Sequence, residues 1–236
     1  MLILVLLSTI VLANAAETTF SGGQKSSYRE RMDGWHFFKR HMKYYLLRRT
    51  YAVPGGSQNA MCVQAPFSPK VYTDEHKLEK TFTYRNISST HKIDPVNNTS
   101  APRWPVAKFL MQFYVSQDKR RFTHLMTKQG YNYVNSTHLT TAFGYALPEP
   151  EWNFLYSNRR CAVVTLPPLT HRLPPVKPHC ELWVSVNKTN TDPEFDHKRN
   201  WFICDALMKR KCDNEYEEQV YNSTICGPVF EKSKQK

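Results

Sequence analysis

The chain has 236 residues, a net charge of +12 at pH 7 and a sequence pI near 9.4. In a cytosolic protein this balance would favour nucleic acid as the partner. The sequence contains no GxSxG, HExxH, P-loop or GxGxxG motif and no CxxC pair. We therefore expect neither an enzyme nor a metal or cofactor site.

The first 16 residues, MLILVLLSTIVLANAA, form an apolar run that ends in small residues fitting a signal-peptidase site. The run is too short to span a bilayer, and no other stretch is apolar enough to do so. We predict a signal peptide at 1–16 and a secreted, extracellular protein that contacts no membrane. Export removes nucleic acid as a partner and leaves an anionic ligand, or glycosaminoglycans contacted through the basic surface.

A flexible leader is expected at 17–26, one domain at 27–230 and a basic tail at 231–236. The domain opens with a capping-box pattern, Ser27-x-x-Glu30, followed by apolar residues at helical spacing. Those apolar residues are Met32, Trp35, Phe38 and Met42. The pattern predicts an N-terminal helix.

Segments of strand-like composition follow, and Pro- or Gly-containing, Asn-rich or charged stretches separate most of them. They are residues 43–53, 60–66, 78–86, 106–115, 121–128, 139–146, 151–157, 161–166 and 180–187. Because so many short strands follow one another, we expect an antiparallel barrel or sandwich rather than βαβ units.

The last predicted element is a helix that begins at the N-cap pair Asp192-Pro193. Five apolar residues fall on one stripe of it: Phe195, Phe202, Ile203, Ala206 and Leu207. The helix also carries two cysteines, Cys204 and Cys212. We therefore expect disulfides to attach it to the outside of the sheet.

Two further sequence features point to the secretory pathway. Six cysteines, an even number, indicate three disulfides, although spacing alone leaves the connectivity open. They are Cys62, Cys161, Cys180, Cys204, Cys212 and Cys226. Six N-x-S/T sequons mark expected glycosylation sites in exposed turns. They begin at Asn86, Asn97, Asn98, Asn135, Asn187 and Asn222.

The segment HCELWVSV, residues 179–186, places a carboxylate in an otherwise strand-like run. Strand alternation puts Glu181 and Trp183 on one face and Cys180 and Leu182 on the other. This indicates an inward-facing pocket residue, and the alternative is an edge-strand Glu in water. A buried Glu is costly unless it is protonated or paired, and a cationic ligand between aromatic walls supplies such a partner. The 13 Tyr, 13 Phe and 5 Trp residues by themselves favour a simple aromatic core.

Several short motifs occur in an order and at a spacing that resemble those of a known family. They are Trp35 in the opening helix, YYLLRRTY before Cys62-Val63, Cys161-Ala162-Val163, Glu181-Leu182-Trp183, Cys204 and Cys226. Together they resemble the salivary lipocalins of ticks, the histamine-binding group.

The resemblance implies an eight-stranded antiparallel barrel with flanking helices, the C-terminal helix being packed on the outer wall. It implies the disulfides Cys62–Cys226 and Cys161–Cys204, which leave Cys180 and Cys212 for each other. Members of this family sequester histamine, serotonin or fatty-acid derivatives such as leukotrienes and thromboxane.

The resemblance also implies the site residues. Glu181 and Trp183 match the amine-binding motif, and Tyr51, Phe143 and Tyr145 resemble residues that line the pocket. Ala162 replaces an Asp that amine binders carry, and no acid follows the first strand. These departures leave one carboxylate candidate.

Three functions follow from these observations, and in each case we expect a monomer. Glu181 favours trapping of a biogenic amine, whereas the positive charge and the lost acids favour an anionic lipid mediator. The third function is a surface-acting inhibitor of complement or clotting, which a barrel filled with side chains would favour.

Overall fold

The computed structural model describes eight stretches of the chain. They are residues 32–66, 69–87, 104–115, 130–141, 145–167, 177–186, 201–213 and 215–226. The predicted signal peptide at 1–16, the leader at 17–26, the strand at 121–128 and the tail at 231–236 lie outside the described residues.

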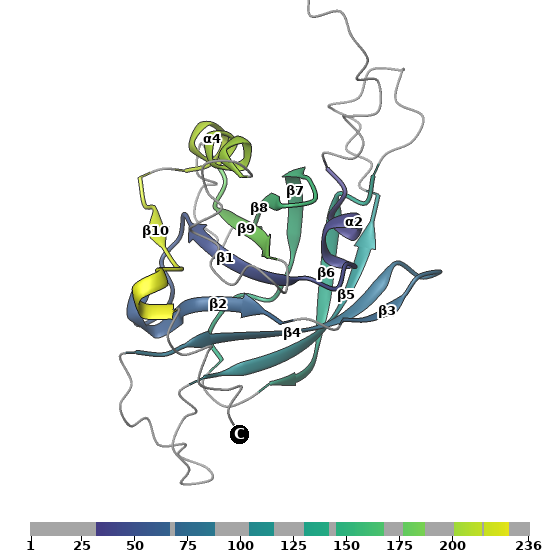
Figure 1. Ribbon diagram of the computed structural model, residues 1–236, viewed down its shortest axis with the longest axis horizontal. Coiled ribbons are helices and arrows are strands. Elements are labelled where there is room, and N and C mark those ends of the chain that lie inside the picture. The colour runs from purple at the N-terminus through teal and green to yellow at the C-terminus, as the bar shows by residue number, and fades with distance from the viewer. Residues whose placement is uncertain are drawn as a thin grey trace, which may run out of the picture.

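Eight strands form a closed antiparallel ring (Figure 1). They are β1 (Lys43–Arg49), β2 (Met61–Ala65), β4 (Lys77–Arg85), β5 (Val106–Tyr114), β6 (Tyr133–Thr141), β7 (Trp152–Ser157), β8 (Cys161–Thr165) and β9 (Cys180–Val186). Each strand pairs with the next, and β9 pairs with β1 to close the ring. The eight-stranded antiparallel barrel is therefore confirmed.

Three short elements extend the ring. Strand β3 (Lys70–Tyr72) pairs with β4, and β10 (Glu218–Gln219) pairs with β1 beside β2. A 3-10 turn, η1 (Ser57–Ala60), leads into β2. Strands β3 and β10 were not predicted, because two or three residues carry too little alternation to be recognised.

Strand β6 begins and ends earlier than the strand predicted at 139–146. The strand runs over Tyr133–Thr141 instead. An exposed turn was expected at the sequon of Asn135, and that expectation is wrong. In the structure Asn135 lies within the strand with its side chain exposed, while Val134 and Ser136 on either side are buried. A sequon on the outer face of a strand meets the same need for exposure.

The helix α2 (Gly34–Phe38) is shorter than the predicted N-terminal helix, which was expected to reach Met42. Its N-cap is Asp33, whose carboxylate accepts a hydrogen bond from the backbone N–H of His36 at 2.9 Å. The predicted cap residues, Ser27 and Glu30, lie outside the described residues.

Helix α2 packs against one end of the barrel, where its aromatic side chains meet rings from the strands. Trp35 contacts Phe113 of β5, and Phe38 stacks on Trp152 of β7 with ring centroids 5.5 Å apart. A Cβ atom at Gly34 would lie 2.1 Å from the ring of Phe154. Glycine is therefore required at this position because the helix backbone lies directly on an aromatic ring.

Helix α4 (Phe202–Lys211) lies on the outer wall of the barrel near β7, β8 and β9, as expected (Figure 1). The predicted apolar stripe is wrong, since Phe202 is 57% exposed and Ile203 is 44% exposed. The buried residues are Trp201, Cys204 and Met208. Asp192, Pro193 and Phe195 lie outside the described residues.

The disulfides explain which face of α4 is buried. Cys161–Cys204 and Cys180–Cys212 join the helix to β8 and β9, and residues 204, 208 and 212 share one helical face. The third bridge, Cys62–Cys226, fastens the C-terminal segment to β2. All three implied pairings are confirmed.

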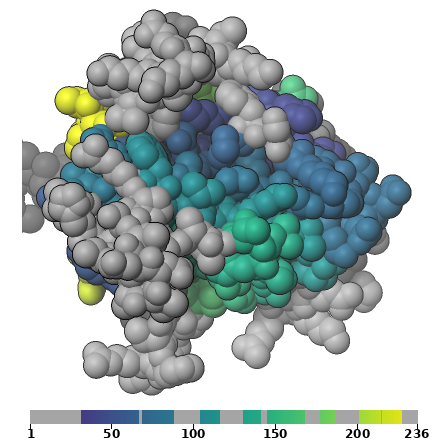
Figure 2. Space-filling model, turned by 90° about the horizontal axis from the view of Figure 1, so that it is seen from below, coloured from purple at the N-terminus to yellow at the C-terminus, as the bar shows by residue number. Residues whose placement is uncertain are grey.

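Strands β3, β4 and β5 lie side by side on one face of the molecule (Figure 2). Glu79 of β4 pairs with Lys70 at 3.5 Å and with Lys108 of β5, and it accepts a hydrogen bond from the Tyr72 hydroxyl at 2.6 Å. These contacts lower the pKa of Glu79 to about 2. Side chains on the other face of β4 are buried in the barrel, so the strand separates an ionic surface from an aromatic interior.

Candidate binding site

Strand β9 shows the alternation expected for it. Trp183 belongs to the cluster that fills the barrel interior, while Cys180 and Leu182 belong to a second cluster between the barrel wall and α4. Glu181 is 5% exposed and lies on the same side as Trp183. The interpretation of Glu181 as an edge residue in water is therefore wrong, and its carboxylate is inside the barrel.

Two neutral donors hold the Glu181 carboxylate. The Tyr51 hydroxyl donates to Oε1 at 2.5 Å, and the Trp183 indole N–H donates to Oε2 at 2.8 Å. Burial raises the pKa of Glu181, and these two bonds and the charge of Arg49 oppose that rise. Among the described residues, no Lys, Arg or His nitrogen lies within 4.0 Å of this carboxylate. Glu181 is thus hydrogen-bonded but has no ion-pair partner there.

Two further tyrosines lie near Glu181. Tyr84 of β4 and Tyr145 have ring centroids 5.4 Å apart, and the backbone N–H of Ala146 donates to the Tyr84 hydroxyl at 2.8 Å. Burial raises the pKa of Tyr145, and Tyr84 and Glu181 add to that rise.

The structure therefore brings four of the five predicted site residues into one region: Tyr51, Tyr145, Glu181 and Trp183. The fifth, Phe143, lies outside the described residues.

An aromatic layer fills the barrel between this region and α2. Trp183 lies 5.6 Å from Trp152, 5.7 Å from Phe82 and 6.1 Å from Phe38, measured between ring centroids. These rings come from β9, β7, β4 and α2, so they meet across the interior.

Sequence reasoning missed Lys80, which is 1% exposed on β4. Its Nζ donates to the carbonyl oxygen of Pro66 at 2.9 Å and lies 4.5 Å from the centroid of the Tyr44 ring. Burial lowers the pKa of Lys80 to about 7. The signal was present in the sequence, since Lys80 occupies the same alternating positions as Leu78 and Phe82, which face the core.

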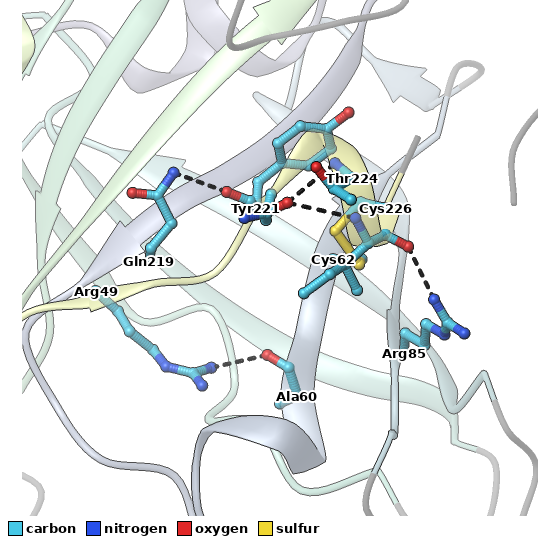
Figure 3. The surroundings of a disulfide bond; sticks show 10 residues. Arg49, Ala60, Cys62, Arg85, Gln219, Tyr221, Thr224 and Cys226 are labelled. Carbon is cyan, nitrogen blue, oxygen red and sulfur yellow. Dashed lines mark hydrogen bonds between the residues drawn. A yellow bond between two sulfur atoms is a disulfide. The ribbon is translucent and has the colours of Figure 1, made fainter. Parts of the chain in front are cut away.

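Sequence reasoning also missed Arg49, which is 0% exposed. A bulge in β1 between Leu46 and Arg48 changes the alternation. Arg48 therefore faces α4, where it pairs with Asp205, and Arg49 comes to lie opposite Glu181. Arg49 donates to Glu218 at 2.6 Å. It also donates to the carbonyl oxygen of Ala60 at 3.3 Å (Figure 3).

Part of the chain matches the model of a known protein family. Residues 23–103 match the family model described as tick histamine binding protein. Over this segment the chain is similar to the tick histamine-binding proteins. No curated protein matches the chain.

One similar solved structure is Japanin from Rhipicephalus appendiculatus bound to cholesterol. Japanin is 12% identical to this chain, with a TM-score of 0.41, and the match covers 77% of this chain and 92% of Japanin. At that similarity nothing about the ligand is transferred.

The predicted glycosylation sites differ in exposure. Asn135 is exposed on β6 and Asn222 is half-buried, whereas Asn86 is only 6% exposed at the end of β4. Asn97, Asn98 and Asn187 lie outside the described residues. Glycosylation stays a prediction, and Asn135 is the site best presented to solvent.

The described ranges contain neither a candidate membrane span nor a candidate metal site. No helix there is long and apolar enough to cross a membrane. No group of three or more His, Cys, Asp or Glu side chains in the same ranges could hold a metal ion.

Proposed function

We propose that this protein is secreted and sequesters a small biogenic amine, histamine or serotonin, inside its barrel. The observation that supports this is the buried Glu181 carboxylate, which has hydrogen-bond donors but no cationic partner among the described residues. A buried carboxylate of this kind favours a ligand that brings the missing positive charge.

Tyr51 and Trp183 orient the Glu181 carboxylate for such a ligand. Their hydrogen bonds fix its two oxygens, and each oxygen keeps a lone pair that can accept from an ammonium group. A protonated amine would gain a charge-assisted hydrogen bond worth roughly 1.5–3 kcal/mol. Contact of the cation with the faces of Tyr84 or Tyr145 would add about 0.5–2 kcal/mol.

An anionic fatty-acid mediator is the second candidate, and Lys80 is the observation that favours it. This ammonium is buried in the barrel wall and has no carboxylate within 4.0 Å among the described residues. A carboxylate-bearing lipid would supply the counter-charge, as an amine would for Glu181. The amine is preferred because the predicted aromatic residues gather around Glu181 rather than around Lys80.

Calorimetric titration of the wild type and Glu181→Gln with histamine, serotonin and a leukotriene tests the proposal. We expect Glu181→Gln to weaken amine binding by a factor on the order of ten to a hundred while the protein stays folded. Glu79→Gln, which removes a carboxylate from the outer face of β4, is the matched control and should bind amines as the wild type does.

Two outcomes count against the amine. Equal histamine affinity in the wild type and Glu181→Gln would show that this carboxylate is not the counter-ion. Leukotriene binding that is lost in Lys80→Met, in a protein that binds no amine, would favour the anionic mediator instead.

A further inference from the structure

Three charged residues lie in one row across three neighbouring strands. Arg49 of β1 is paired in register with Glu181 of β9 on one side and with Glu218 of β10 on the other. Side chains directly opposite one another in antiparallel strands project to the same face of the sheet. The buried Arg49 guanidinium therefore lies between two buried carboxylates and could form an ion pair with either of them.

Arg49 takes Glu218. Its Nε donates to Glu218 Oε2 at 2.6 Å, and the exposed fractions of the two side chains are 0% and 8%. The pair is not saturated, because Arg49 Nη2 and Glu218 Oε1 have no hydrogen-bond partner in the described part of the chain. None of the guanidinium nitrogens comes within 4.0 Å of Glu181, although the charge is near enough to act on its pKa.

The C-terminal segment holds Glu218 in this place. The backbone N–H of Val220 donates to the carbonyl oxygen of Leu47 at 2.8 Å, and the N–H of Cys62 donates to the carbonyl oxygen of Val220 at 2.9 Å. The disulfide Cys62–Cys226 closes the same segment onto β2 (Figure 3). Glu218 is thus fixed from outside the ring of eight strands.

We propose that Glu218 is a specificity-determining positioning residue, which holds Arg49 and so leaves Glu181 free for a cationic ligand. This inference rests on the proposed function. Removing one partner of a buried ion pair leaves the other charge uncompensated. Without the Glu218 carboxylate, Arg49 would turn to the nearest remaining carboxylate in its row, Glu181, and occupy the place of the ligand.

The test compares Glu218→Gln with Glu217→Gln. Glu217 is the adjacent acid, but it pairs with Arg48, whose other acidic partner is Asp205 of α4. In histamine titrations we expect Glu218→Gln to weaken binding by a factor on the order of ten to a hundred and Glu217→Gln to leave it unchanged. The double variant Arg49→Met/Glu218→Gln lacks the competing cation and should recover the wild-type affinity to within about threefold.

A readout without ligand separates this inference from the proposed function. Carbon-13 NMR titration of the Glu181 carboxyl, assigned by its absence in Glu181→Gln, should show a lower pKa in Glu218→Gln because Arg49 then pairs with it. If that pKa falls while the wild type binds no amine, the amine function fails and the positioning role stands. If the pKa and the amine affinity both stay at wild-type values in Glu218→Gln, the positioning role is refuted.

The double variant also keeps the test decisive if Glu218→Gln does not fold, because it leaves neither charge of the pair buried alone. Amine affinity in the double variant equal to that of the wild type supports the inference. Amine affinity as low as that of Glu181→Gln overturns it, since the Arg49–Glu218 pair would then support binding in some other way.

Discussion

Replacing Lys80 by Met should stabilise the protein, and by an amount that depends on pH. Burial lowers the pKa of Lys80 from 10.5 to about 7. Between those two values the unfolded chain carries a proton on this amine that the folded protein lacks, so stability rises with pH. Each pKa unit corresponds to about 1.4 kcal/mol, so the charged amine destabilises the fold by up to about 5 kcal/mol below pH 7. By pH 9 that cost falls to about 2 kcal/mol.

Guanidinium unfolding of the wild type and Lys80→Met at pH 6 and pH 9, followed by tryptophan fluorescence, measures this difference. The stability advantage of Lys80→Met should shrink by about 3 kcal/mol between the two pH values. Lys80→Met also loses packing and the hydrogen bond to Pro66, and these losses lower its stability equally at pH 6 and pH 9. The change of the stability difference with pH is therefore the diagnostic quantity. Lys108→Met is the control, because Lys108 lies on the outer face and pairs with Glu79. Stability curves for Lys80→Met and the wild type that run parallel across this range would refute the reasoning.

Three further predictions concern packing and the site. Gly34→Ala should lower the free energy of unfolding by about 1–3 kcal/mol, because its Cβ would lie 2.1 Å from the Phe154 ring; an unchanged melting temperature would show that α2 can shift freely. In denaturant unfolding, Met208→Ala should lower the free energy of unfolding by about 2–5 kcal/mol and Phe202→Ala by less than about 0.5 kcal/mol. The reverse order would show that the predicted apolar stripe, which contains Phe202, is the buried face of α4. Histamine affinity measured by calorimetry should fall as the pH is lowered through the raised pKa of Glu181, while Glu181→Gln should show no such dependence on that group.

Much of the fold could be predicted from local patterns. Strand β9 illustrates why, since its alternation fixes Glu181 and Trp183 inside and Cys180 outside with no information from elsewhere in the chain. The order of motifs also implied the three disulfides, which the structure confirms. Four of the five expected site residues lie together because they belong to β9, the end of β1 and the segment after β6.

The features that could not be predicted depend on contacts between distant segments. The inward orientation of Arg49 follows from a bulge in β1, and its partner Glu218 belongs to a strand of two residues that is placed by a distant disulfide. The buried face of α4 is fixed by its two disulfides rather than by its most apolar residues, which is why Phe202 and Ile203 are exposed. Such effects become visible only when the segments are seen side by side.

A crystal structure of the protein grown with histamine tests the central claim most directly. The account predicts that the ligand ammonium nitrogen lies within about 3.2 Å of a Glu181 carboxylate oxygen, with Tyr51 and Trp183 still donating to that carboxylate. It also predicts that Arg49 remains paired with Glu218. Histamine bound on the outer surface of the barrel, or inside it with Arg49 on Glu181, would contradict the account.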